Sequence, residues 1–176
     1  IEPLESIMPL TPFHLGPGIF FGTILWSKYF YLPAVLIGSI FPDIEPVTLI
    51  LYNYPYPPLD YPHHGILHSF LAGILSAILF AIILRHYHWP AERWWKRIFS
   101  RFYPGQKKTF FNIFSGTLFG YWIHIFFDSI MHYDVFPFWP SKFNPFLRII
   151  SIAEEYSLII TLGVLGLVLF LLKVVN

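Results

Sequence analysis

Three long apolar runs constrain the fold of this chain more than any other feature. They are Gly65–Leu84, Phe110–Met131 and Tyr156–Leu172. At about 1.5 Å of rise per residue, a helix of roughly 20 apolar residues crosses the hydrocarbon core of a bilayer, which is about 30 Å thick. Over the whole chain 56% of the residues are hydrophobic and 12% are charged, which is unusual for a soluble domain. We therefore expect an integral membrane protein.

Two shorter apolar runs, Phe13–Trp26 and Tyr31–Phe41, precede the long ones and predict a tight helical hairpin. Together the runs predict an all-α, polytopic helix bundle with about five membrane-embedded helices. We detect no internal repeat and no second domain, so residues 1–176 are expected to form a single membrane domain. We expect Met8 to be the natural start, and residues 1–7 are left out of this prediction.

The segment 85–108 is the one long polar connection, and it holds seven of the eleven lysines and arginines. The positive-inside rule predicts that this basic loop is cytoplasmic. Within it, apolar residues such as Trp94 and Phe102 recur at helical spacing opposite arginines and lysines, which is typical of an amphipathic helix on the membrane surface. We therefore expect a multi-pass protein of the plasma or inner membrane.

The composition also limits the chemistry. The chain has no cysteine, so any metal ion must be bound by nitrogen and oxygen atoms. Its net charge is +1, and no block of basic residues alternates with aromatic residues on a polar surface. A nucleic-acid partner is therefore not expected.

Ionisable residues lie inside the second long run. His124, Asp128 and His132 are spaced by four, so a helix places them on one face. Gly116 and Gly120 continue the same stripe, and small residues let helices approach closely in lipid. We therefore expect this face to point into the protein, with His124 in the outer leaflet.

Other segments deliver similar residues to the same depth. His64 and His68 are four apart on the third predicted helix, His14 opens the first helix, and Asp43 ends the second. A charged group in the bilayer costs at least about 2.5 kcal/mol, so such residues are functional candidates. Imidazole nitrogens and carboxylate oxygens suit zinc or manganese. The pattern predicts one metal site at the outer end, with the ligands His14, Asp43, His68, His124 and Asp128.

The remaining ionisable residues receive simpler interpretations. His86 and His88 flank the basic loop and are expected to lie at the membrane interface without a catalytic role. Asp134, Glu154 and Glu155 are expected to be solvated.

Four short motifs in a fixed order carry a family resemblance. They are Thr-Pro-Phe-His14-Leu, Phe-Pro-Asp43-Ile-Glu45, His63-His64-Gly65-Ile66-Leu67-His68-Ser69 and His124-Ile-Phe-Phe-Asp128. With them the chain resembles the YdjM-like family of membrane proteins proposed to be metal-dependent hydrolases. That family usually shows Pro-Asp-Ile-Asp and His-Arg-Gly-x-Thr-His-Ser, so Glu45, His64 and Leu67 depart from its pattern. His63 matches the motif position of a metal ligand and His64 has the better spacing to His68, so both stay candidates.

The order of these motifs is also similar to that in zinc-dependent phospholipase C. That resemblance implies hydrolysis of a phosphoester at a site with one to three divalent ions, zinc first and manganese as the other choice. We expect a lipid or lipid-linked substrate, because the predicted site opens at the extracytoplasmic head-group level. Water activated by the metal ion would attack the phosphorus. Glu45, His64 or His132 would act as the general base or acid.

A divalent-metal transporter or metal-sensing membrane protein is the alternative, since it would use the same ligands without cleaving a bond. Transport needs a polar route through both leaflets. The inner parts of the long helices, Gly73–Leu84, Phe110–Ile123 and Gly163–Leu172, contain no charged residue and no histidine. The sequence therefore favours hydrolysis.

Overall fold

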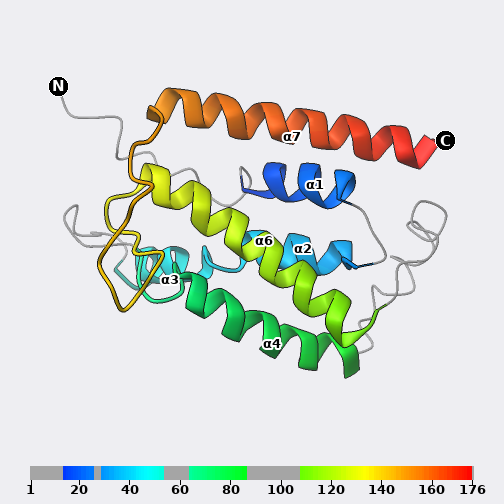
Figure 1. Ribbon diagram of the computed structural model, residues 1–176, viewed down its shortest axis with the longest axis horizontal. Coiled ribbons are helices and arrows are strands. Elements are labelled where there is room, and N and C mark those ends of the chain that lie inside the picture. Colours follow the sequence, from blue (N-terminus) through cyan, green and yellow to red (C-terminus); the bar gives the residue numbers. More distant parts are fainter. Residues whose placement is uncertain (1–13, 26–28, 54–63, 87–107, 176) are drawn as a thin grey trace.

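The computed structural model describes residues 14–25, 29–53, 64–86 and 108–175 (Figure 1). This part of the chain folds into six α-helices and no β-strand, which confirms the predicted all-α class. The helices are α1 (Leu15–Ile24), α2 (Leu32–Ile40), α3 (Ile44–Asn53), α4 (Phe70–His86), α6 (Phe110–Met131) and α7 (Ile152–Val175). The predicted surface helix of the basic loop and the candidate ligand His63 lie outside the described residues.

The chain runs in opposite directions along α1 and α2, and again along α4, α6 and α7 in turn, as Figure 1 shows. α1, α4 and α7 begin at the end of the molecule where α2 and α6 finish. α6 packs against both α2 and α4, while α1 packs against both α7 and α2. The short helices α1 and α2 thus lie side by side, as the predicted hairpin requires. The starts of three helices and the ends of two therefore meet at one end of the bundle.

Glycines bring α2 close to α6. A Cβ atom at Gly120 would overlap the carbonyl oxygen of Val35, and one at Gly116 would lie 2.9 Å from the carbonyl oxygen of Tyr31. On α2, a Cβ atom at Gly38 would overlap the backbone of α6. Small residues permit such approach between helices in a membrane. The predicted inward-facing stripe of α6 is therefore confirmed.

α6 and α7 are the two described helices that are long and apolar enough to cross a membrane. Their mean hydropathies are 1.3 over Phe110–Met131 and 2.2 over Ile152–Lys173, while α1 and α4 are shorter apolar helices. Large apolar side chains are exposed along α4 and α7, among them Leu75, Ile82 and Val168, and such a surface suits contact with lipid. Two of the roughly five expected crossings are thus supported by length and composition, and the others stay predictions.

The third predicted helix begins later than its apolar run. α4 starts at Phe70, after turns formed by residues 64–69. Ser69 caps the helix, because its Oγ atom accepts a hydrogen bond of 3.2 Å from the backbone N–H three residues on. The prediction that His64 and His68 share a helical face is therefore wrong, since both lie in the turns before the helix.

A short helix, α3, follows Asp43 although Pro42 and Pro46 lie at its start. Pro46 falls in its first turn, where a backbone N–H has no helical partner to lose. The prolines therefore shape the start of a helix here and do not prevent it. As a result Asp43 lies at the corner between α2 and α3, and Glu45 lies in the first turn of α3.

Candidate metal centre

The carboxylate of Asp128 is the centre around which three histidine rings gather. Its Oδ2 atom lies 2.9 Å from His124 Nε2 and 3.3 Å from His68 Nε2. Its Oδ1 atom lies 3.1 Å from His14 Nε2. All four side chains are buried. The carboxylate therefore has two faces, one toward His68 and His124 and the other toward His14.

Each of these residues is placed by a different part of the bundle. His124 and Asp128 are one turn apart on α6, as their spacing predicts. His14 is the residue before α1, and His68 lies in the turn before α4. That turn is held on α6, because the hydroxyl of Tyr121 donates a hydrogen bond of 2.5 Å to the carbonyl oxygen of Leu67, the residue before His68.

Asp43 completes the group from the α2–α3 corner. Its Oδ1 atom is 3.6 Å from His124 Nε2, and its Oδ2 atom is buried without a hydrogen-bond partner. Asp43, His68, His124 and Asp128 each offer a ligand atom within 4.8 Å of the others, and we call these four residues the central cluster. The cluster is all nitrogen and oxygen, as a chain without cysteine requires.

Contacts behind the cluster orient its two histidines. His124 Nδ1 donates a hydrogen bond of 2.8 Å to the carbonyl oxygen of Ser39. His68 Nδ1 is 3.1 Å from Glu45 Oε2. Because a carbonyl oxygen only accepts, His124 carries its proton on Nδ1 in the neutral ring and Nε2 presents a lone pair. The same arrangement at His68 leaves Nε2 facing Asp128, so both rings present the atom that binds metal ions.

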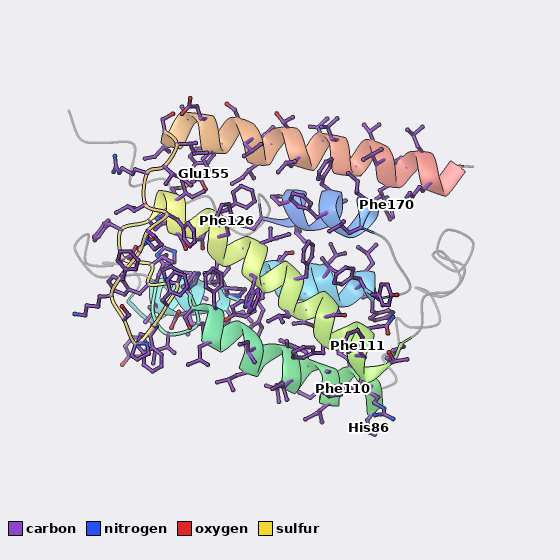
Figure 2. The ribbon with its side chains drawn as sticks, in the orientation of Figure 1. His86, Phe110, Phe111, Phe126, Glu155 and Phe170 are labelled. Atoms are coloured by element: carbon purple, nitrogen blue, oxygen red, sulfur yellow. The ribbon has the colours of Figure 1, made fainter. Side chains whose placement is uncertain are left out.

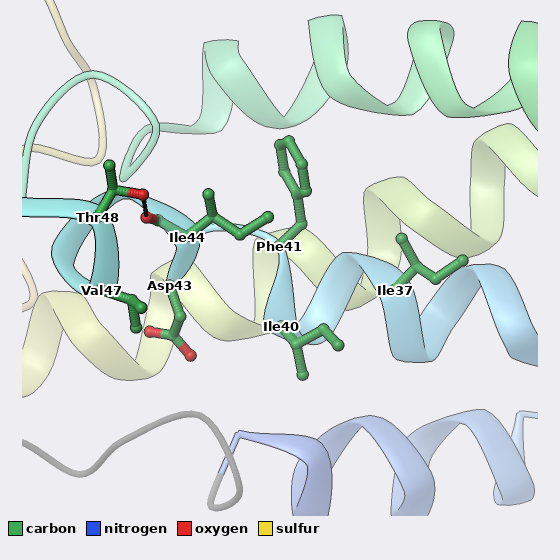
Figure 3. Close-up of a pocket in the computed structure, with 7 residues that line it drawn as sticks. All are labelled: Ile37, Ile40, Phe41, Asp43, Ile44, Val47 and Thr48. Carbon is green, nitrogen blue, oxygen red and sulfur yellow. Dashed lines mark hydrogen bonds between the residues drawn. The ribbon is translucent and has the colours of Figure 1, made fainter. Parts of the chain in front are cut away.

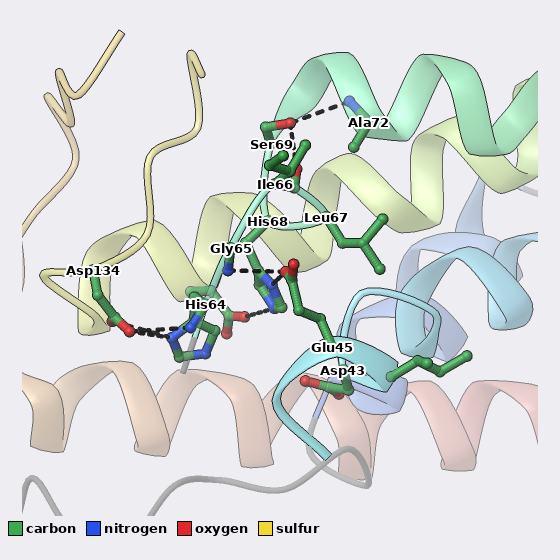
Figure 4. A network of polar contacts seen from close by, with 12 residues as sticks. Asp43, Glu45, His64, Gly65, Ile66, Leu67, His68, Ser69, Ala72 and Asp134 are labelled. Carbon is green, nitrogen blue, oxygen red and sulfur yellow. Dashed lines mark hydrogen bonds and ion pairs between the residues drawn. The ribbon is translucent and has the colours of Figure 1, made fainter. Parts of the chain in front are cut away.

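The Glu45 carboxylate orients the His68 ring (Figure 4). Its Oε2 atom also accepts a hydrogen bond of 2.9 Å from the backbone N–H of Gly65. A Cβ atom at Gly65 would overlap the Glu45 carboxylate, so a larger residue there would displace that carboxylate from its present position. Burial by itself would raise the pKa of Glu45, but the hydrogen bonds from His68 and from Gly65 hold that pKa below its usual value.

A second group, formed by His64, His132 and Asp134, lies beside the cluster. His64 Nδ1 is 3.0 Å from Asp134 Oδ1, and the backbone N–H of His64 donates to Oδ2 at 3.1 Å. The His64 ring centre lies 4.5 Å from that of His132 and 4.4 Å from that of His68. Figure 4 shows the Asp134 side chain reaching the His64 ring. The expectation that Asp134 is solvated is therefore wrong.

Burial and hydrogen bonds set the charge states of this second group. Burial lowers the pKa of His132 to about 4, so its ring is neutral at physiological pH. Burial alone would raise the pKa of Asp134, yet the hydrogen bonds from His64 hold it well below its usual range. Asp134 is therefore an anion that fixes the orientation of His64.

The expectation that Glu155 is solvated is also wrong. It is 0% exposed, and neither of its side-chain oxygens has a hydrogen-bond partner. Its neighbour Glu154 is exposed as predicted, and accepts hydrogen bonds from the backbone and hydroxyl of Ser151 at 2.8 Å and 2.6 Å. The Ser-x-x-Glu pattern is a capping box that starts α7. This pattern is a sequence signal that distinguishes the two glutamates. It assigns Glu154 to the helix cap, and the next residue, Glu155, then points about 100° away from it around the helix axis.

The structure brings together five of the six predicted ligands, namely His14, Asp43, His68, His124 and Asp128. The sixth, His63, lies outside the described residues, and His64 interacts with Asp134. Of the three residues predicted as acid or base, Glu45 contacts the cluster and His64 and His132 lie next to it. His86 is exposed at the opposite end of the bundle (Figure 2).

An apolar groove of about 340 Å³ is lined by residues of α2, of α3 and of the corner between them (Figure 3). Its lining residues are Ile37, Ile40, Phe41, Asp43, Ile44, Val47 and Thr48. The hydroxyl of Thr48 donates to the carbonyl oxygen of Ile44 at 2.5 Å, so its proton is already used. Asp43 thus supplies the one charged group of the groove and is also a member of the central cluster.

Fold and site together define a class: a helical protein with two helices long and apolar enough to cross a membrane and a buried histidine–carboxylate cluster able to bind a metal ion. Within that class the chain belongs to the family of the YdjM inner membrane protein, whose model matches residues 8–175. Comparison with curated proteins and with solved structures finds no match.

Proposed function

We propose that this protein is a membrane-embedded, metal-dependent hydrolase that cleaves a phosphoester in a lipid or lipid-linked substrate at the extracytoplasmic end of the bundle. The observation that carries the proposal is the convergence of two histidine Nε2 atoms and two carboxylates in the central cluster. The cluster also shares Asp43 with an apolar groove.

The spacing of the cluster fits a metal ion. A tetrahedral ion with bonds of about 2.0–2.1 Å holds neighbouring ligand atoms roughly 3.3 Å apart. The distances from His124 Nε2 to Asp128 Oδ2 and to Asp43 Oδ1 are 2.9 Å and 3.6 Å, and that from His68 Nε2 to Asp128 Oδ2 is 3.3 Å. Both Nε2 atoms are close to the carboxylate, and neither has a hydrogen-bond partner. They are placed around a common point, and zinc is the ion that we propose for it.

A bound divalent ion would supply there an acidified water molecule and positive charge for the phosphoryl oxygens. The residues of the chain then provide orientation and proton transfer. His64 is the best placed general base, because Asp134 holds its Nδ1 side and leaves Nε2 free to take a proton. Glu45 supports His68 instead, since its carboxylate is already bonded to two partners.

The groove supports a substrate with a hydrocarbon chain. Its volume of about 340 Å³ falls within the usual range of ligand pockets, which is roughly 300–1,000 Å³. Its walls are aliphatic and aromatic, so burial of a hydrocarbon chain is favourable. Because Asp43 belongs to both the groove and the cluster, a chain in the groove places its polar end near the metal ligands.

Metal analysis combined with activity measurements tests this proposal. The full chain, purified in detergent, is assayed for bound metal and for hydrolysis of bis-(p-nitrophenyl) phosphate and of lipid extracts. We expect metal and turnover in the wild type and in His86→Ala, and loss of both in His68→Ala. A wild-type protein that binds no metal would refute the proposal. Bound metal without turnover on any ester would favour the transporter, which metal flux into liposomes then tests.

A further inference from the structure

The segment that carries His68 into the central cluster is held by two neighbouring side chains of α6. The hydroxyl of Tyr121 donates a hydrogen bond to the carbonyl oxygen of Leu67 at 2.5 Å, and the indole N–H of Trp122 donates to the carbonyl oxygen of Phe70 at 3.1 Å. Leu67 directly precedes His68 (Figure 4), and Phe70 is the first residue of α4. The two bonds therefore lie on either side of His68, and we call this pair of contacts the α6 clamp.

The hydroxyl of Tyr121 is buried at a position where the ring alone would fill the space. Tyr121 is 0% exposed, and its ring packs with Ala72 and Ile125 in one apolar cluster, against which Leu67 also packs. A buried hydroxyl is unfavourable unless it is hydrogen-bonded. Phenylalanine would fill the same cluster without that requirement. The bond to the segment that carries His68 therefore accounts for the hydroxyl.

His68 depends on such support more than the ligands on α6 do. His124 and Asp128 lie inside α6, where the helix fixes their backbone. His68 lies in the turns before α4, yet its ring has partners on both sides: Nδ1 is 3.1 Å from Glu45 Oε2, and Nε2 is 3.3 Å from Asp128 Oδ2. A binding site tolerates displacements of only about 0.5 Å in its ligands. The backbone position of His68 therefore decides whether its ring completes the central cluster.

We propose that Tyr121 and Trp122 are positioning residues of the metal centre, which fix His68 as a ligand by holding the carbonyl groups on either side of it. The inference rests on the metal binding proposed above and adds two residues that are not themselves ligands. Because both act through the backbone, removing either hydrogen bond weakens zinc binding while every ligand stays in the chain. Residues behind metal ligands usually contribute about 10–100-fold in metal affinity.

The zinc affinity of clamp variants tests the inference without relying on activity. The full chain in detergent is stripped of metal, and its affinity for Zn²⁺ is measured by competition with a chromophoric chelator. We expect Tyr121→Phe and Trp122→Phe each to bind zinc about tenfold more weakly than the wild type. The matched control is Ser115→Ala, which removes a hydroxyl near the other end of α6 that donates to the carbonyl oxygen of Tyr29 at 2.6 Å. This control should keep the wild-type affinity.

Cobalt substitution separates positioning of His68 from a general loss of stability. The absorption spectrum of bound Co²⁺ depends on the geometry of its ligands, so a displaced His68 should change the spectrum in both clamp variants and not in Ser115→Ala. Wild-type affinity and an unchanged cobalt spectrum in either clamp variant would overturn the inference, and so would an equal loss of affinity in Ser115→Ala. No zinc in the wild type would instead refute the metal binding on which both proposals rest.

Discussion

Asp128 lies one helical turn after His124 on α6, with its Oδ2 atom 2.9 Å from His124 Nε2. Its other oxygen lies 3.1 Å from His14 Nε2, so this one carboxylate joins α1 to α6. The residue is buried and surrounded by imidazoles whose Nε2 atoms point at it. Asp128 is therefore the side chain on which the proposed metal centre depends most.

Asp128→Asn should remove bound metal and abolish hydrolysis. The amide keeps the size of the side chain but loses the negative charge that a divalent ion requires. We expect phosphoester hydrolysis to fall by at least about 100-fold, because a bound ion supplies several kcal/mol of transition-state stabilisation. Metal content and initial rates are measured together, with Glu154→Gln as the control. An Asp128→Asn protein that keeps its metal would contradict the assignment.

Glu45→Gln separates a supporting role from a catalytic one. If Glu45 orients His68, its replacement should weaken metal affinity by roughly 10–100-fold, as is usual for residues behind the ligands. Saturating metal should then restore kcat. If Glu45 were the general base, kcat would stay low at saturating metal while the metal affinity remained unchanged. Titration with Zn²⁺ followed by rate measurements distinguishes these outcomes.

Asp134→Asn tests the orientation of His64. Asparagine can donate a proton to the ring and so favour the wrong tautomer. Since general base catalysis contributes about 10²–10⁴-fold, we expect kcat to fall by roughly 10–100-fold with no change in zinc stoichiometry. If zinc is lost as well, Asp134 supports a metal ligand and His64 is not the base.

Much of the centre could be predicted because it depends on helical periodicity. A spacing of four places His124 and Asp128 on one face in any α-helix, and the glycines of the same stripe turn that face inward. The candidates His14 and Asp43 were found in a similar way, since each flanks a short apolar helix. The local sequence pattern and the expected helix ends were sufficient to identify these residues as candidate ligands.

The rest depends on contacts between distant segments, which periodicity does not encode. His68 reaches the cluster from a turn that Tyr121 holds in place, so its spacing to His64 was misleading. Asp134 is buried by a partner 70 positions earlier in the chain. Glu155 is buried at the start of α7, a helix that packs on α1 and α6, and no local pattern indicates these contacts between helices.

Gly120→Ala should destabilise the bundle, because the new methyl group would overlap the carbonyl oxygen of Val35 on α2. Overpacking of this kind typically costs about 1–3 kcal/mol. Thermal unfolding in detergent, followed by tryptophan fluorescence, measures the change. Gly163→Ala is the matched control, since its Cβ atom would lie 3.3 Å from Gly16 and needs only a small adjustment. Equal melting temperatures for the two variants would argue against close α2–α6 packing.

Ile44→Trp should discriminate between substrates. Ile44 lines the groove on α3, so a larger side chain there would occupy the space proposed for a hydrocarbon chain. We expect KM for a long-chain lipid phosphoester to rise by about tenfold, since losing one to two kcal/mol of apolar burial corresponds to that factor. The rate with bis-(p-nitrophenyl) phosphate should stay unchanged, because that ester has no chain to bury. Leu51→Trp, an exposed position of the same helix that does not line the groove, is the control. If Ile44→Trp slowed both substrates equally, the groove would not be the binding site of the chain and the effect would lie at the metal ligands.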